Sequence, residues 1–288
     1  MKSPSPLRYP GGKAAFTNFF GKVLEKNGLD GGLYAEAFGG GAGAALGLLF
    51  QGYVDRVAIN DADPRIFAFW KSALTNTTKF IKRIESTPLN IDEWTKQRAI
   101  YLNPNGKSAL ALGFSAFYLN RCNRSGILVN GGPIGGKHQS GKWKIDARFN
   151  KAQLIGRFEM MAEYGDRIQA FGADAKDFIA GIPKLAGADT HLLYLDPPYY
   201  EKGSLLYMNH FTGIDHSNLG ALVKKLKLNW LMTYDDCSEI RDIYSWANYR
   251  EFSLKYSAYE SRKGGEILIW PVGMKIPDLQ GSQKIAVK

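Results

Sequence analysis

The stretch Leu192-Leu193-Tyr194-Leu195-Asp196-Pro197-Pro198-Tyr199-Tyr200 joins an apolar run to an acid, two prolines and two tyrosines. The apolar part has the length of one buried β-strand, which belongs inside a sheet. Pro197 and Pro198 lack the N–H group that a strand needs, so the strand must stop there. A carboxylate and an aromatic ring are therefore held at the C-terminal end of a strand, where open α/β sheets bind their ligands.

This corner suits a planar base that carries an exocyclic amine. The lone pair of such an amine is delocalised, and a site can direct it toward an electrophile by accepting both N–H hydrogens. Asp196 and the carbonyl of Pro197 can accept them, and Tyr199 can stack on the ring. We hypothesise that a methyl group is transferred to a base here; a sulfonium methyl needs no metal, and alignment supplies most of the acceleration. The alternative is a simple strand-ending turn, in which Asp and Pro are common.

A strand, a glycine turn and a helix are indicated upstream. The buried run Leu33 to Phe38 precedes Gly39-Gly40-Gly41-Ala42-Gly43 and a helical stretch over residues 44–50. Asp61 follows the next strand, Arg56 to Asn60, 22 positions after Gly39, the spacing at which an acid meets a ribose hydroxyl. The turn favours an adenosine cofactor, but it also fits G-x-G-x-x-A, so an NAD-dependent oxidoreductase is an alternative. The other alternative is a tight turn followed by a surface Asp.

A turn-rich loop, Arg8-Tyr9-Pro10-Gly11-Gly12-Lys13, leads into a predicted amphipathic helix from Ala14 to Lys26. Two glycines beside a lysine can bring backbone N–H groups and an ammonium close to an anion. The loop lacks the spacing and the Ser/Thr of a P-loop.

The formal net charge of +10 lies in one segment. Residues 67–159 hold 15 Lys and Arg but 5 Asp and Glu, and the rest of the chain is neutral. A neutral body with one basic segment indicates a polyanionic partner, although a generally basic, soluble surface is the alternative. Helices are predicted over residues 67–84, 92–102 and 108–119, so the segment reads as a helical insertion between two parts of the sheet. Its loops interleave Asn, Gly and Trp with basic residues that suit phosphate contact and base reading, although such stretches are also typical of solvated loops.

The remaining chain returns to a sheet pattern. Strands are predicted over residues 168–171, 230–234, 248–256 and 266–271, and helices after the capping residue Asp174 and over residues 218–227. The polar residues 201–211 are expected to be mobile, and the tail after Pro277 to be disordered.

Composition excludes several classes of protein. No apolar run is long enough to span a bilayer, and the N-terminus lacks the core of a signal peptide. Cys122 and Cys237 make no disulfide framework, and no Cys/His cluster has the spacing of a zinc site. We expect a reduced, cytoplasmic protein without a metal.

In the order of its motifs, the chain resembles the Dam-like, S-adenosylmethionine-dependent DNA adenine-N6 methyltransferases over most of residues 6–270. The stretches that carry the resemblance are 8–13 (cofactor binding), 36–43 (glycine motif), 60–61 (ribose-binding acid), 117–121 (opening of the target-recognition region) and 196–199 (catalytic motif). Asp196 distinguishes the tetrad from the Ser-Pro-Pro-Tyr of cytosine-N4 enzymes and the Asn-Pro-Pro-Tyr of glutamine methyltransferases.

The resemblance implies an α/β fold, with a Rossmann-like class I methyltransferase sheet and a mainly helical target-recognition insertion. The catalytic domain would span residues 1–66 and 160–277, the DNA-binding insertion 67–159 and the tail 278–288. Site-specific methylation would occur on an adenine flipped out of double-stranded DNA, by direct attack on the cofactor's methyl group. The catalytic residues would be Asp196, Pro197, Pro198 and Tyr199. S-adenosylmethionine would be bound by Tyr9, Lys13, Phe38, Gly39, Gly41, Asp61, Asp174 and Asp196, and DNA by Arg121, Arg124, Lys142 and Lys144. We expect a monomer or weak dimer.

The chain departs from this resemblance in the recognition region. Members that read GATC usually have an aromatic-Asn-Gly stretch and a basic residue three positions later, whereas this chain has Arg124-Ser125-Gly126 and Val129. This departure argues against GATC as its site. A catalytically silent DNA-binding relative remains an alternative to an enzyme. The sequence leaves open whether an active enzyme would be solitary, restriction-associated or encoded by a phage.

Overall fold

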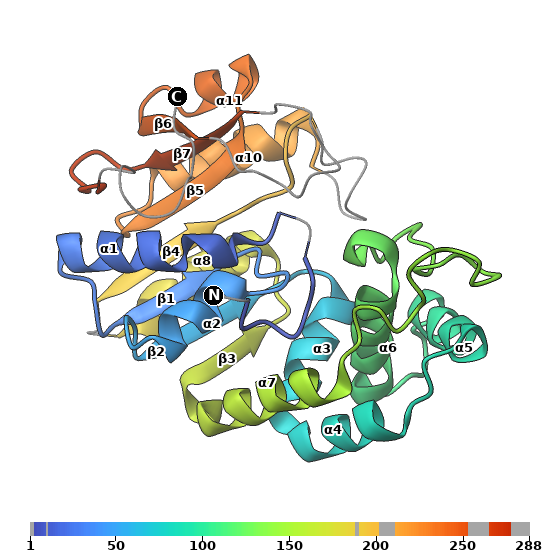
Figure 1. Cartoon of the computed structure of the whole chain (residues 1–288). Helices are drawn as coiled ribbons and strands as arrows, with labels where there is room; N and C mark the ends of the chain where they lie inside the picture. The colour runs from blue at the N-terminus through green and yellow to red at the C-terminus, as the bar shows by residue number, and fades with distance from the viewer. Residues whose placement is uncertain (1–2, 10, 188–189, 202–210, 253–264, 278–288) are drawn as a thin grey trace.

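One twisted sheet forms the centre of the chain. The structure is a computed structural model that describes residues 3–9, 11–187, 190–201, 211–252 and 265–277. Within these residues, seven strands pair in the order β3-β2-β1-β4-β5-β7-β6 (Figure 1). They are β1 (Leu33–Glu36), β2 (Arg56–Asn60), β3 (Ile168–Phe171), β4 (His191–Leu195), β5 (Trp230–Asp235), β6 (Asn248–Phe252) and β7 (Glu266–Trp270). β7 is antiparallel to both of its neighbours, β5 and β6, and the other pairs in this order are parallel. The predicted Rossmann-like sheet is confirmed.

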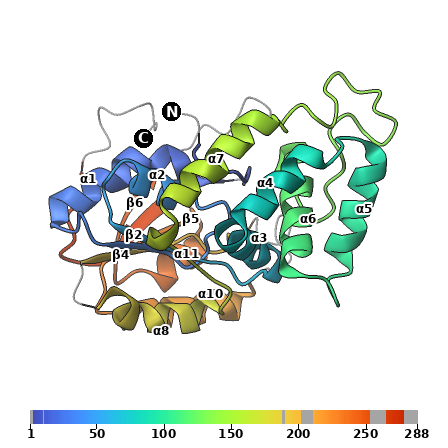
Figure 2. The same cartoon turned by 90° about the horizontal axis from the view of Figure 1, so that it is seen from below.

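Helices cover both faces of the sheet because its inner strands are apolar on both sides. Tyr34 and Tyr194 pack with the core under α1 and α2, whereas Leu33 and Leu193 pack with the core on the other face. Figure 2 shows α1 and α2 on one side and α8 and α10 on the other. The covering elements are η1 (Lys13–Phe16), α1 (Thr17–Asn27), α2 (Gly43–Phe50), α8 (Ala175–Ala186), α10 (Gly213–Lys224) and α11 (Ser238–Ile243).

A group of helices lies beside the sheet, past the ends of β1 and β2 (Figure 1). They are α3 (Pro64–Thr75), α4 (Thr77–Ser86), α5 (Ile91–Leu102), α6 (Ala109–Cys122) and α7 (Lys151–Glu163), followed by the short turns η2 (Arg124–Gly126) after α6 and η3 (Gly165–Arg167) after α7. Phe80 of α4 packs against three of the others, with ring centroids 5.7 Å from Phe69, 5.4 Å from Phe117 and 4.9 Å from Phe158. The predicted domain boundaries, 66/67 and 159/160, fall inside α3 and α7, so two continuous helices join the helical part to the sheet.

Two predicted helices are wrong in extent. The single helix expected over residues 67–84 is two helices, which meet at Asn76, where the backbone leaves the helical region (φ −133°, ψ 34°). Asn and the neighbouring threonines compete with the helix for backbone hydrogen bonds. The helix expected over 218–227 spans Gly213–Lys224 instead, because Thr212 and Asp215 form a capping box that starts it earlier.

Most other elements are confirmed to within a few residues, although α7 and α11 had no predicted counterpart. The expected mobile segment falls largely on residues 202–210, which lie outside the described residues. The predicted extension of β6 to residue 256 and the tail 278–288 lie outside them too.

The arrangement of strands creates one switch point. β1 pairs with β2 on one side and with β4 on the other, and Glu36 lies opposite both Ile59 and Tyr194. The chain leaves β1 toward one edge of the sheet and β4 toward the other. The loops after β1, β2 and β4 therefore open at the same place, as in other doubly wound sheets.

Candidate active site

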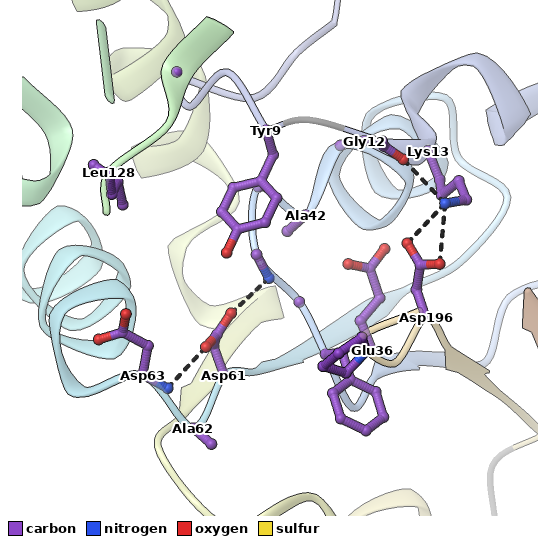
Figure 3. A pocket seen from close by; sticks show the side chains of 18 of the residues that line it. Tyr9, Gly12, Lys13, Glu36, Ala42, Asp61, Ala62, Asp63, Leu128 and Asp196 are labelled. Atoms are coloured by element: carbon purple, nitrogen blue, oxygen red, sulfur yellow. Dashed lines mark hydrogen bonds and ion pairs between the residues drawn. The ribbon is translucent and has the colours of Figure 1, made fainter. Parts of the chain in front are cut away.

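A pocket lies at this switch point (Figure 3). Seven of the eight residues predicted to bind a cofactor line it, namely Tyr9, Lys13, Phe38, Gly39, Gly41, Asp61 and Asp196. Pro198 and Phe211 line it from the segments after β4, and Gly126 to Val129 line it from the helical part. The structure thus brings together motifs that are almost two hundred positions apart in the sequence.

The glycine turn after β1 packs too closely for side chains. Gly39 donates its N–H to the carbonyl of Asn60 at 2.6 Å, and a Cβ on Gly39 would lie 2.5 Å from Cγ2 of Ile59. A Cβ on Gly40, which has a φ of +46°, would lie 2.8 Å from the ring of Tyr9. Tyr9 therefore rests directly on the turn, which explains why one wall of the pocket needs glycines.

Asp61 is fixed beside that turn by two backbone donors. Its Oδ2 accepts the N–H of Gly40 and its Oδ1 that of Asp63, both at 2.9 Å (Figure 3). Burial raises the pKa of Asp61 to about 7, and the neighbouring charge of Asp63 adds to the effect. A carboxylate held in this way keeps further lone pairs for a ligand.

Asp196, at the end of β4, is held by three donor contacts. The Nζ of Lys13 lies 3.0 Å from Oδ1 and 2.8 Å from Oδ2, and the hydroxyl of Thr233 donates to Oδ1 at 2.6 Å. Lys13 is buried and also donates to the Tyr199 hydroxyl at 3.2 Å. One lysine thus links the N-terminal loop to the first and last residues of the tetrad.

A second layer of polar groups supports Asp196 from beneath. The Tyr194 hydroxyl lies 2.6 Å from the Thr233 oxygen, which has already given its single hydrogen to Asp196, so Tyr194 donates here. Glu36 accepts the N–H of Ala45 at 3.0 Å through Oε1. Burial raises the pKa of Glu36 to about 8, and the charge of Asp196 reinforces this shift.

Asp235 fixes the segment that follows the tetrad. Its two oxygens accept the N–H groups of Tyr200 and Glu201, each at 2.8 Å, and the residue is 2% exposed. Sequence analysis missed both Asp235 and Thr233 as site residues. The polar residues at the end of β5 could have indicated them, because β5 lies beside β4 in a parallel sheet.

A comparison with known families matches residues 9–258 to the family described as D12 class N6 adenine-specific DNA methyltransferase. The chain belongs to this family. It is an adenine-specific DNA methyltransferase, EC 2.1.1.72. A comparison with curated proteins finds no match. The match favours methyl transfer over the nicotinamide alternative, since it covers the glycine turn and the tetrad together.

The other predicted site residues of the methyltransferase are spread more widely. Pro197 is buried, whereas Asp174 is exposed and outside the pocket, where it caps α8 by accepting the N–H of Lys176 at 2.8 Å. Arg124, Lys142 and Lys144 are exposed on loops of the helical part. Arg121, in contrast, is buried at the end of α6.

Within the described residues of the methyltransferase, no group of three or more His, Cys, Asp and Glu side chains is placed to hold a metal ion. In the same part of the chain, no helix is both long and apolar enough to cross a membrane.

Proposed function

We propose that this methyltransferase transfers the methyl group of S-adenosylmethionine to N6 of an adenine turned out of a DNA duplex, by direct in-line attack at a specific site. One observation carries the proposal: Asp196 faces the same pocket as the glycine turn and Asp61. A group suited to hold an amine thus adjoins a set suited to hold a nucleoside.

The residues of the pocket fit S-adenosylmethionine. Asp61 presents a carboxylate suited to ribose hydroxyls, and Tyr9 and Phe38 offer ring surfaces for the cofactor's base. Glu36 and Asp196 line the other side of the pocket, where the carboxylate of Asp196 favours a positive charge. When bound, S-adenosylmethionine supplies a methyl group that its sulfonium charge makes electrophilic.

The role of Asp196 is to orient the target amine. A carboxylate accepts about four hydrogen bonds. Lys13 and Thr233 already make three contacts with this one, so an amine hydrogen takes the remaining position or replaces a contact from Lys13. The carbonyl of Pro197 would accept the second amine hydrogen, and Tyr199 would stack on the base. As N6 gains its methyl group it loses a proton, which Asp196 can accept.

The helical part would hold the DNA. An adenine cannot reach a pocket at a strand end while it is stacked in a duplex, so the base must be extruded. Arg124, Lys142 and Lys144 would contact the backbone from exposed loops, and Arg121 from the end of α6. We propose residues 67–159 as the recognition insertion of a cytoplasmic enzyme that acts as a monomer or weak dimer.

Transfer of labelled methyl groups from S-adenosylmethionine to duplex DNA tests the proposal. We expect Asp196→Ala to abolish transfer and Asp30→Ala, an exposed control, to leave it unchanged. An Asp196→Ala variant as active as the parent would refute the role of the tetrad. DNA binding by a parent protein that does not bind the cofactor would favour a silent relative instead.

Two further measurements examine the finer steps. Sequencing that detects N6-methyladenine in DNA from cells expressing the enzyme would give its recognised site. The fluorescence of 2-aminopurine placed at the target position should rise on binding if the base leaves the stack. Unchanged fluorescence in a productive complex would contradict extrusion.

A further inference from the structure

Four arginines from separate parts of the chain converge beside the pocket. Arg8 precedes Tyr9, Arg121 lies near the end of α6, Arg148 precedes α7 and Arg157 lies within α7. Burial lowers the pKa of Arg121 to about 9, and the charges of Arg157, Arg8 and Arg148 lower it further. These four residues, which we call the arginine cluster, therefore lie close enough for the charges of the other three to act on Arg121.

Hydrogen bonds hold two members of the arginine cluster, Arg8 and Arg157, in place. The side chain of Asn120 accepts the N–H of Arg8 and donates to its carbonyl, both at 2.7 Å. Nη1 of Arg157 donates to the carbonyl of Ser5 at 2.7 Å, and Nη1 of Arg8 reaches the carbonyl of Asn123 at 3.5 Å. Each of these two guanidiniums retains several other N–H donors.

The positive charge of the arginine cluster is not balanced within the described residues. There, none of its four members forms a salt bridge, and Asp146, two residues before Arg148, is exposed and pairs with none of them. Arg121 is 9% exposed, and its buried Nε has no hydrogen-bond partner in that part of the chain. A buried cation in this state is costly, so the site is incomplete without an anion.

The arginine cluster also borders the pocket. Tyr9, next to Arg8, lines the pocket, and so do Gly126 to Val129, which follow α6. The two segments touch, because a Cβ on Gly126 would lie 2.3 Å from the carbonyl oxygen of Arg8. Figure 3 shows Tyr9 and Leu128 on the same side of the pocket.

We propose that the arginine cluster binds one backbone phosphate of the DNA, adjacent to the nucleotide that enters the pocket. Guanidinium groups match phosphate oxygens through paired N–H donors, and Arg121 supplies a buried anchor while Arg148 remains exposed. This inference rests on the proposed function, since it assumes that an extruded adenine occupies the pocket.

Duplexes that carry one neutral methylphosphonate linkage at successive positions around the target adenine test the inference. For the parent enzyme, one linkage beside the target should weaken binding by about tenfold to a hundredfold. Arg121→Gln should show the same weakening on ordinary DNA and should no longer respond to that linkage. Arg148→Gln and Arg157→Gln, at less buried positions, should show the same coupling to a smaller degree, and each should reduce the salt slope by up to about 0.9.

Lys225→Gln, at an exposed position at the C-terminal end of α10, is the control and should bind each duplex as the parent does. If the losses of binding from Arg121→Gln and from the methylphosphonate add at every linkage, the inference is overturned. The proposed function stands in that case, provided that the parent still transfers methyl groups. If the parent transfers no methyl group, inorganic phosphate replaces DNA as the probe. Thermal stabilisation by phosphate that Arg121→Gln lacks would then support an anion site, and equal stabilisation of both would refute it.

Discussion

Replacing Thr233 with Val removes a hydroxyl while keeping the shape of the side chain. The lost bond to Asp196 is 2.6 Å long and ends on a carboxylate. Hydrogen bonds to charged groups contribute about 1.5–3 kcal/mol. If this bond holds Asp196 in place for the reaction, Thr233→Val should lower kcat by about tenfold to about 150-fold.

Single-turnover transfer of labelled methyl groups to DNA measures this loss, together with the affinity for S-adenosylmethionine. Thr233→Ser retains the hydroxyl and should keep most of the activity. Thr233→Val also leaves the Tyr194 hydroxyl unpaired in a buried position, at a cost of about 1–3 kcal/mol to folding. Tyr194→Phe should remove that cost in the double variant and restore stability without restoring kcat.

A catalytic role for the Thr233 hydroxyl would be refuted by a Thr233→Val variant that is folded and turns over within twofold of the parent. It would equally be refuted if Tyr194→Phe restored kcat together with stability, because Thr233 would then act through folding alone.

Four further changes probe the same site. Glu36→Gln should stabilise the protein relative to the parent as the pH rises. Burial favours the neutral form of Glu36, so the parent loses stability between pH 4.5 and about 8. In chemical unfolding, the difference in unfolding free energy between variant and parent should grow by at most about 1.4 kcal/mol per pH unit. Lys13→Met should lower kcat at least about tenfold by releasing Asp196 and Tyr199, as rapid-quench kinetics would show. Asp235→Asn should lower kcat/KM by about tenfold, because the N–H of Tyr200 or of Glu201 loses its acceptor. Asp236→Asn is the neighbouring control and should not show this loss. Gly39→Ala should destabilise the fold by about 1–3 kcal/mol in a denaturant titration and weaken cofactor binding, because its Cβ meets Ile59; unchanged stability would contradict the packing described.

The sheet and the principal motifs could be predicted because their signals are local. The proline pair ends β4 at a definite residue, and the glycines after β1 mark a turn wherever they occur. Parallel pairing then places strand ends at one edge, which explains why Asp61 and Asp196 line one pocket as expected. Such inferences need only the sequence within a few residues of each motif.

The supporting residues could not be predicted because their roles depend on distant partners. Thr233 is an ordinary strand residue until the register of β5 places it against Asp196. Asp235 looks like a residue of a turn, although its carboxylate serves a loop after another strand. Periodicity likewise cannot reveal the break at Asn76, where backbone angles rather than hydrophobic spacing end the helix.

The double hydrogen bond between Asn120 and Arg8 provides a physical link between the proposed DNA site and the proposed cofactor site. One side chain joins the segment that leads to Tyr9 with the helix that leads to the basic loops. If Tyr9 holds the cofactor as proposed, a shift of this joint on binding DNA would also move that wall of the pocket. By linkage, the factor by which DNA changes cofactor affinity must equal the factor by which cofactor changes DNA affinity. Asn120 is therefore a position at which a single substitution should weaken the coupling between the two affinities.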